Sequence, residues 1–369
     1  MKNLEATLAQ LIAIRTVSST RPEAKEEGKR ANKAAMDWVV RELSKLPIKV
    51  FSRYIKTNGQ PMLLITTRKT NSPEILFYVH MDVVPASDEM FKAKKKGAYL
   101  YGRGAYDMKF ALACYLKLLA ELGEDLPKYD FGILITSDEE IGGDSVPIAL
   151  KKIKPKICVM PDGGKHGELD RTVKGMMQIT VTSKGISTHA STPWKGRNAI
   201  NQLMAFLQDV QKEFSFRNVR KGKHKHNTLN IGTFQAGSTT NQVPGLAKAT
   251  IDIRFIPNTT KADLKSVIRD VLKNHPSITT KVTFADASFV IDQQNEYVRR
   301  FKAIASKVLK CKMTSGISHG SSDATYFVAR GIPVISTRPL GGGLHGEKER
   351  VNLRDLRKFY QILKEFATS

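Results

Sequence analysis

The chain has 369 residues and an ordinary globular composition, 41% hydrophobic and 25% charged, and this length suggests two or three domains. No apolar run approaches the roughly 18 residues of a membrane-spanning helix, and the amino terminus lacks the uninterrupted apolar stretch of a signal peptide. The net charge of +24 attracts anions of any kind, but the lysine clusters at Lys92–Lys96, Lys151–Lys156 and Lys221–Lys225 have no interleaved aromatic residues. We expect a solvated basic surface, with a polyanion site as the alternative.

The three cysteines, Cys114, Cys158 and Cys311, are far apart in the sequence. They form no Cys-x-x-Cys pair, so neither a disulfide framework nor a thiolate zinc site is indicated. Such cysteine usage indicates a reducing compartment, and we expect a cytoplasmic protein.

The first part of the chain predicts two helices followed by three strands. Helical spacing begins at Leu4, and a second helix is expected over about Ala24–Leu46. Strands are expected at Lys49–Tyr54 and Met62–Thr67, and then in the apolar run that opens Ile75–Pro85. That run resembles a strand buried on both faces, which is typical of a largely parallel sheet.

The apolar run ends in two polar side chains, His80 and Asp82. Ligands of open α/β sheets bind at the carboxyl ends of strands, and residues two apart in an extended chain point the same way. Either both side chains reach one site, or Asp82 orients the imidazole of His80 from behind. The alternative is a buried, satisfied histidine beside a turn aspartate, because His-x-Asp alone is a weak motif.

Acidic residues recur at the next three boundaries between elements. After the charged connector Lys92–Gly97, Asp107 stands where a helix begins, and its alternative role is an N-cap. The expected strand Phe131–Thr136 leads to Asp138, Glu139 and Glu140, which repel one another unless a cation compensates them. A solvated acidic turn is the alternative. The short strand Ile157–Met160 leads to Asp162.

The pattern of apolar and polar residues changes near Gly175. The order from there is strand, helix, strand, strand, helix, strand, which is typical of a small α+β layer with helices on one face. The expected elements are Met176–Ser183, Ala199–Phe214, Thr228–Phe234, Lys248–Phe255, Lys261–Lys273 and Thr279–Phe284. We therefore expect an inserted, ferredoxin-like domain at 175–290 between the two parts of an α/β domain, 1–174 and 291–369.

The last part of the chain returns to the α/β pattern of the first part. It predicts a helix over Tyr297–Leu309, a helix opening near Asp323, a strand at Pro333–Ser336 and a final helix from Leu353. A glycine-rich stretch before the final helix contains His345.

Five potential metal ligands thus stand after strands or before helices. Two imidazoles and three carboxylates suit zinc, cobalt or manganese. Five side chains exceed the ligand set of one catalytic zinc ion and fit two ions that share a bridging carboxylate. The spare acid, Glu139, can then act as a general base, and Asp82 can hydrogen-bond the far nitrogen of His80. The five candidate ligands are His80, Asp107, Glu140, Asp162 and His345.

Three motifs together resemble the dinuclear zinc peptidase and amidohydrolase family, which includes succinyl-diaminopimelate desuccinylase, acetylornithine deacetylase, aminoacylase, glutamate carboxypeptidase and peptidase T. The motifs are His80–Pro85, Gly102–Lys109 and Asp138–Gly143. The resemblance extends over essentially the whole chain. It implies a zinc-peptidase catalytic domain with a mixed, mostly parallel sheet between helices, and an inserted lid or dimerisation domain.

The resemblance also implies roles for the ligands. One zinc ion would take His80 and Asp162, the other Glu140 and His345, and Asp107 would bridge them, with Glu139 as the general base. The implied activity is hydrolysis of amide bonds in dipeptides, short peptides or N-acyl amino acids. In this family an aspartate at the position of Asp162 tends to accompany dipeptidases and aminopeptidases, which favours peptides here.

The inserted domain matches the family's lid. In the motif around Gly185–Pro193, His189 is implied to stabilise the oxyanion, often from the partner subunit of a homodimer. Asn241 and Arg254 match positions that grip the substrate's carboxylate, although Arg254 could instead form a surface ion pair and His189 could be an exposed loop histidine. Ser321 and Ser322 match a loop that lines the substrate pocket and are candidate donors.

Two residues depart from the family pattern. Phe110 and Val79 stand where relatives commonly have glycine. Both could alter packing near the metal ions without removing a ligand. A hypothesis of another class, a non-enzymatic polyanion binder that uses the basic surface, is weakened by the complete ligand set.

Overall fold

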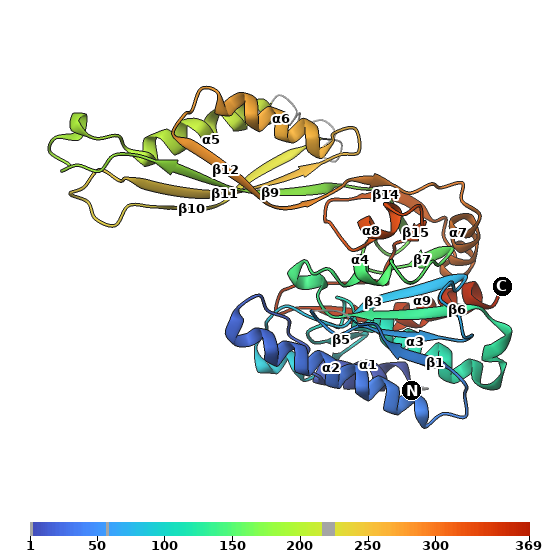
Figure 1. Cartoon of the computed structure of the whole chain (residues 1–369). Helices are drawn as coiled ribbons and strands as arrows, with labels where there is room; N and C mark the ends of the chain where they lie inside the picture. The colour runs from blue at the N-terminus through green and yellow to red at the C-terminus, as the bar shows by residue number, and fades with distance from the viewer. Residues whose placement is uncertain (1–2, 57–58, 216–225) are drawn as a thin grey trace. The chain divides into compact units, whose positions relative to one another are not determined.

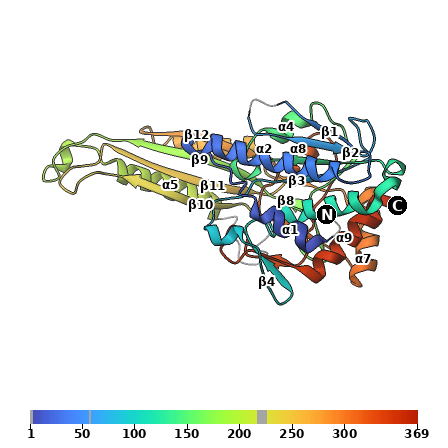
Figure 2. The same ribbon diagram turned by 90° about the horizontal axis from the view of Figure 1, so that it is seen from below.

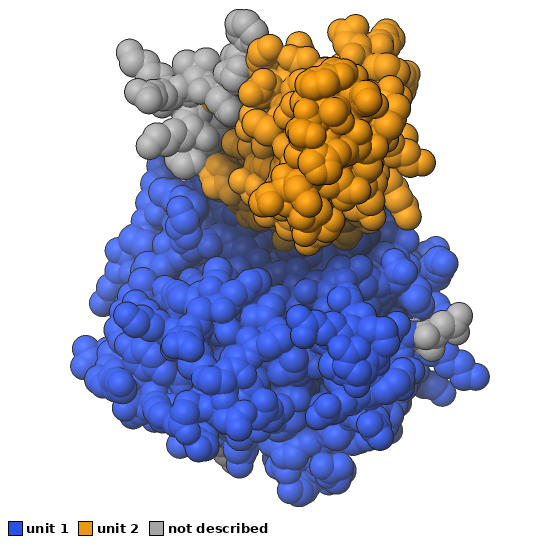
Figure 3. Space-filling view, turned by 90° about the vertical axis from the view of Figure 1, so that its left-hand side faces the viewer, with its two compact units in different colours: residues 1–171, 291–316, 322–369 blue, residues 172–290, 317–321 orange. Residues whose placement is uncertain are grey.

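The computed structural model describes residues 3–56, 59–215 and 226–369 and divides the chain into two compact units (Figure 3). Unit 1 comprises residues 1–171, 291–316 and 322–369, and unit 2 comprises residues 172–290 and 317–321. No helix among the described residues is both long and apolar enough to cross a bilayer. The lysine cluster Lys221–Lys225 lies outside the described residues, whereas Lys92–Lys96 and the lysines of Lys151–Lys156 are exposed.

The main sheet of unit 1 has six strands in the order β1-β2-β6-β3-β7-β15. The strands β6, β3, β7 and β15 run parallel, and β1 and β2 add antiparallel pairs at one edge. This confirms the expected mixed, mostly parallel sheet. The strands are Phe51–Tyr54 (β1), Leu63–Thr66 (β2), Ile75–His80 (β3), Phe131–Thr136 (β6), Ile157–Val159 (β7) and Val334–Ile335 (β15).

Apolar residues of the strands form the core around this sheet. Every residue of β3 and β6 is buried, as expected for strands covered on both faces. Helix α3 packs against β3, α1 and α9, and Figures 1 and 2 both show α7 beside α9. The helices of unit 1 are Leu4–Ala13 (α1), Pro22–Ser44 (α2), Lys109–Leu122 (α3), Ser145–Ala149 (α4), Glu296–Leu309 (α7), Ala324–Val328 (α8) and Leu353–Thr368 (α9).

A second sheet of unit 1 has the order β16-β17-β5-β4. Its strands are Lys94–Lys96 (β4), Tyr99–Tyr101 (β5), Gly341–Gly342 (β16) and Arg350–Asn352 (β17). The pairing of β17 with β5 joins chain segments that are about 250 residues apart in sequence, with Arg350 opposite Tyr101. The expected charged connector Lys92–Gly97 is therefore wrong in part, because Lys94–Lys96 form one strand of a hairpin.

Unit 2 contains a four-stranded antiparallel sheet in the order β10-β11-β9-β12. Helices α5 and α6 pack on one face of it, and the core lies between helices and sheet (Figure 1). A capping box between Thr260 and Asp263 starts α6. The elements are Gly175–Lys184 (β9), Ala199–Ser215 (α5), Thr228–Ala236 (β10), Leu246–Phe255 (β11), Lys261–Leu272 (α6) and Ile278–Asp286 (β12), which confirms the expected order of strands and helices.

The chain passes between the two units within a three-stranded sheet of order β13-β8-β14. These strands are Glu168–Val173 (β8), Phe289–Val290 (β13) and Thr314–Ser318 (β14). None of the three was expected from the sequence, because β8 and β14 mix polar with apolar residues and β13 has only two residues.

Candidate metal centre

The candidate ligands of unit 1 come from the carboxyl ends of three adjacent parallel strands and from two turns. His80 is the last residue of β3, Glu139 and Glu140 follow β6, and Asp162 follows β7. Because these strands run parallel, their carboxyl ends meet at one edge of the sheet. The remaining two ligands are Asp107, which follows β5, and His345, which lies between β16 and β17.

The carboxylate of Asp107 lies between the two imidazoles. Its Oδ1 is 3.3 Å from His80 Nε2, and its Oδ2 is 3.2 Å from His345 Nε2. The alternative role of Asp107 as an N-cap is wrong, because Met108 occupies that position and α3 has no side-chain cap. One oxygen for each imidazole is the arrangement that a bridging carboxylate requires.

Two groups of side chains each bring three ligand atoms within 4.8 Å of one another: His80 with Glu139 and Asp162, and Asp107 with Glu140 and His345. In the second group His345 Nε2 is 3.2 Å from Glu140 Oε2, and in the first His80 Nε2 is 4.0 Å from Asp162 Oδ1. Ligand atoms at tetrahedral corners about 2.0–2.1 Å from zinc stand about 3.3–3.4 Å apart. The donor set and its spacing therefore fit divalent metal ions.

Burial and mutual repulsion make this cluster electrostatically unusual. Burial, followed by the nearby Asp162 carboxylate, raises the pKa of Glu139 well above its usual value. Burial and the Asp107 carboxylate raise the pKa of Asp162 to about 7. Hydrogen bonds to Asp107 and Glu140 raise the pKa of His345 to about 10. A divalent cation would relieve the repulsion among these carboxylates.

Asp82 contacts candidate ligands of both groups. It is fully buried, and its main-chain oxygen lies 3.1 Å from His80 Nδ1, closer than its carboxylate oxygen Oδ1 at 3.6 Å. Its other oxygen, Oδ2, accepts a hydrogen bond from the main-chain N–H of Glu140 at 3.1 Å. Asp82 therefore connects a candidate ligand of each group.

Three further side chains near the site were not predicted. Arg338 donates to Asp162 Oδ1 at 3.3 Å, and buried Arg103 pairs with buried Glu349. Arg103 lies inside a recognised motif, but neither Glu349 nor Arg338 carries a local signal in the sequence. Their partners lie far away along the chain.

The departures Phe110 and Val79 are both fully buried. The Phe110 ring stacks on Tyr106 and meets Phe359 edge-on, so it fills core space behind the Asp107 turn. Neither residue displaces a candidate ligand.

The other predicted site residues lie mainly in unit 2. His189 is exposed, and its Nδ1 accepts a hydrogen bond from Ser191 N at 3.2 Å and contacts Ser191 Oγ at 2.7 Å. Asn241 accepts a hydrogen bond from Thr239 Oγ1 through Oδ1 and from Ala190 N through its carbonyl. Arg254 makes a two-point ion pair with Asp252 on the same strand.

The predicted serines fall on the two sides of the unit boundary. Ser321, in unit 2, donates to Asp286 Oδ2 at 2.7 Å, whereas Ser322 belongs to unit 1. The structure thus gives the hydroxyl of Ser321 a protein partner.

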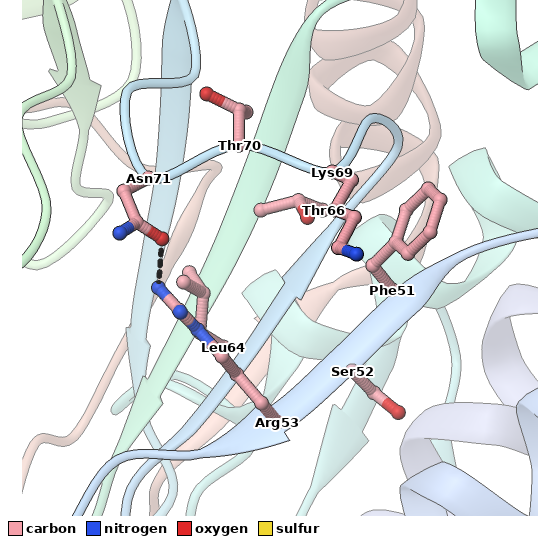
Figure 4. A pocket seen from close by; sticks show the side chains of 8 residues that line it. All are labelled: Phe51, Ser52, Arg53, Leu64, Thr66, Lys69, Thr70 and Asn71. Carbon is pink, nitrogen blue, oxygen red and sulfur yellow. Dashed lines mark hydrogen bonds between the residues drawn. The ribbon is translucent and has the colours of Figure 1, made fainter.

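Two hollows of about 500 Å³ lie elsewhere on unit 1. One is beside α2. The other lies against β1 and β2, where Arg53 hydrogen-bonds Asn71 (Figure 4). None of the residues drawn in Figure 4 is a histidine or a carboxylate, so this hollow lacks metal ligands.

Comparison with known proteins agrees with this geometry. The peptidase family M20/M25/M40 matches residues 76–369. The chain is 27% identical over 350 residues to a succinyl-diaminopimelate desuccinylase of Rickettsia felis, covering 87% of this chain and 90% of the relative. It is 29% identical over 297 residues to the enzyme of that name from Helicobacter pylori strain G27, covering 76% and 75%.

Two solved structures share the fold. An M20 family metallo-carboxypeptidase from Sulfolobus solfataricus superposes with a TM-score of 0.81 at 19% identity, covering 100% of this chain and 99% of the other. A tripeptidase from Staphylococcus aureus superposes with a TM-score of 0.75 at 22% identity, covering 99% and 97%.

Proposed function

This chain belongs to the peptidase family M20/M25/M40, and from that premise we propose that it uses two divalent metal ions to hydrolyse the amide bond of a dipeptide or short peptide. The single observation that carries the proposal is the carboxylate of Asp107, which offers one oxygen to His80 and the other to His345. Zinc is the expected ion, with cobalt or manganese as substitutes. We also propose that unit 1 is the catalytic domain and unit 2 the lid.

The ligands divide into two sets around Asp107. His80 and Asp162 would hold one ion and Glu140 and His345 the other, while Asp107 contributes to both. When bound, the ions would supply Lewis acidity that lowers the pKa of a water molecule and polarises the scissile carbonyl. Asp82 keeps His80 oriented through its carbonyl oxygen and fixes the main chain of Glu140.

Glu139 would move the proton. With Asp107 bridging, both ligand sets are complete without Glu139, although its carboxylate lies within the first group. Its carboxylate would take a proton from the attacking water and deliver it to the nitrogen of the leaving amine.

His189 is the proposed donor to the oxyanion. The Ser191 main-chain N–H donates to Nδ1, so the neutral ring carries its proton on Nε2 and can donate from there. Asn241 and Arg254 would bind the substrate's carboxylate. To do so, Arg254 would break its ion pair with Asp252 and pair with the substrate's carboxylate instead. Ser321 and Ser322 remain candidate donors in the pocket.

A second candidate is hydrolysis of N-acyl amino acids. The observation in its favour is the name that the curated relatives carry, succinyl-diaminopimelate desuccinylase. Against it stands Asp162, whose residue type accompanies peptidases in the resemblance described above.

The test is a panel of dipeptides, tripeptides, and N-acetyl and N-succinyl amino acids. The metal-free protein is assayed alone and after addition of Zn²⁺, Co²⁺ or Mn²⁺. We expect peptide hydrolysis that chelation abolishes and metal addition restores. A preference for N-acyl amino acids would favour the second candidate, and metal-independent or absent hydrolysis across the panel would overturn both.

A further inference from the structure

A buried ion pair joins the turn that carries Asp107 to the turn that carries His345. Arg103 precedes Asp107 by four positions, and Glu349 follows His345 by four. Their side chains are 3% and 0% exposed, and Arg103 Nη1 lies 2.5 Å from Glu349 Oε2. The mechanism above uses neither residue.

Each member of the pair also holds the main chain at a candidate ligand. Glu349 Oε1 accepts hydrogen bonds from the N–H groups of Tyr106 at 2.9 Å and of Asp107 at 3.0 Å. Arg103 Nη2 donates to the carbonyl oxygen of His345 at 3.0 Å. A continuous chain of contacts therefore runs from the Asp107 amide through Glu349 and Arg103 to the His345 carbonyl.

His345 depends on these contacts for its position more than the other candidate ligands do. Its side chain is 55% exposed, and its backbone has a φ of 60°, a left-handed conformation that is uncommon for residues other than glycine. His80, by contrast, is anchored in the ladder between β3 and β6. The turn that carries His345 is closed by a hydrogen bond from Gly346 N to Gly343 O at 3.0 Å.

We infer that Arg103 and Glu349 are positioning residues that set the distance between Asp107 and His345 and thereby the metal affinity of the group Asp107, Glu140 and His345. This inference rests on the proposed function, which makes these residues ligands. Loss of the positioning contacts affects two ligands of that group, Asp107 and His345, but only Asp107 of the other ion, whose His80 and Asp162 follow strands of the main sheet.

The variant Arg103→Lys isolates the proposed effect. A lysine keeps the positive charge beside Glu349, but its single ammonium cannot reproduce the guanidinium fork that reaches both Glu349 and the His345 carbonyl. Metal-free protein is titrated with Zn²⁺ in competition with a chromophoric chelator, which gives two stepwise dissociation constants. His345→Ala, which removes a ligand of one group, identifies the step that belongs to it.

We expect Arg103→Lys to raise one dissociation constant, that of the step missing in His345→Ala, by about 10- to 100-fold. This is the usual effect of residues that orient metal ligands. The other dissociation constant should change by less than about threefold. Arg300→Lys is the matched control, because Arg300 stacks on Tyr297 and Phe366 away from the site. It should leave both constants unchanged. Thermal unfolding of the metal-free variants reports any loss of stability separately.

Two unchanged constants in Arg103→Lys, or two constants raised equally, would overturn the inference while leaving the proposed function intact. A wild-type protein that takes up fewer than two ions would overturn the proposed function and this inference with it. If Arg103→Lys does not fold, Glu349→Asp provides a second test. Its shorter carboxylate keeps the charge but withdraws from the Asp107 amide, and because Asp107 serves both ions, both steps should weaken, the step missing in His345→Ala by more.

Discussion

Glu139 is the residue at which geometry allows two roles. Its carboxylate lies within 4.8 Å of ligand atoms of His80 and Asp162, so it could bind a metal ion or carry the proton. The two roles make opposite demands, because a ligand must stay bound whereas a general base must be free to exchange a proton.

The variant Glu139→Gln separates these roles. Glutamine keeps the shape of the side chain but cannot accept the proton, so we expect kcat to fall by about 10²- to 10⁴-fold. The metal content should equal that of the wild type. Loss of one ion per chain in this variant would instead make Glu139 a ligand.

At the residue scale, the sequence predicted the candidate ligands but not the groups that hold them. His80, Glu140 and Asp162 could be found because each stands next to a recognisable apolar strand. The pair of Arg103 and Glu349 could not, since these residues are 246 positions apart and meet only when β5 pairs with β17. Asp82 was expected to orient His80 through its carboxylate, whereas its carbonyl makes the shorter contact.

At the scale of elements, the strength of the apolar pattern decided what could be predicted. The strand Phe131–Thr136 was predicted with its correct limits, because all its residues are buried and its pattern is uninterrupted. The strand Lys94–Lys96 was missed, because all three lysines are exposed and no periodicity distinguishes them from a connector. Short strands stabilised by pairing alone leave no local signal.

Helix α2 offers a test in which close packing opposes helix propensity. Gly28 is buried on this helix, and a Cβ atom added there would lie 2.5 Å from the main-chain oxygen of Val17. Replacement of a helical glycine by alanine gains about 1 kcal/mol, but overpacking against backbone costs about 1–3 kcal/mol.

We expect Gly28→Ala to lower the free energy of unfolding by about 1 kcal/mol, because the overpacking cost exceeds the gain in helix propensity. Denaturant unfolding measures the change. Glu27→Ala, at the adjacent exposed position, is the control and should stay within about 0.5 kcal/mol of the wild type. A stabilised Gly28→Ala protein would show that α2 does not pack closely on Val17.

At the scale of the whole molecule, the change of texture near Gly175 predicted an insertion. The short return of residues 317–321 to unit 2 could not be predicted, because it depends on pairing of β14 with β8 rather than on composition. The basic surface is distributed over exposed lysines, several of them paired with acids such as Glu89.

In the sheet of unit 2, β10 is an edge strand, and β11 is its one neighbour among the described strands. Exposed apolar residues of unit 2 include Phe234 on that strand and Met204 on α5. Because unpaired edges are liabilities in soluble sheets, we propose that two copies of the chain pair through this unit with two-fold symmetry. His189 would then act in the active site of the partner.

Mixing two inactive variants tests the shared site. His189→Ala and Glu139→Ala are combined under conditions that allow subunits to exchange. If His189 acts on the partner's site, each mixed dimer contains one site with both residues intact, and activity should return to up to about half of the wild-type value per mixed dimer. Monomeric behaviour in solution, or no recovery despite proven exchange, would show that His189 does not act across subunits.

If two metal ions share Asp107, the number of ions bound per chain should show it. Wild type, His80→Ala and His345→Ala are loaded with Zn²⁺, dialysed and analysed by elemental mass spectrometry against protein concentration. We expect two ions per wild-type chain and one in each variant, because each histidine belongs to one ligand set. One ion per wild-type chain, or two retained in both variants, would show that Asp107 does not join two metal sites.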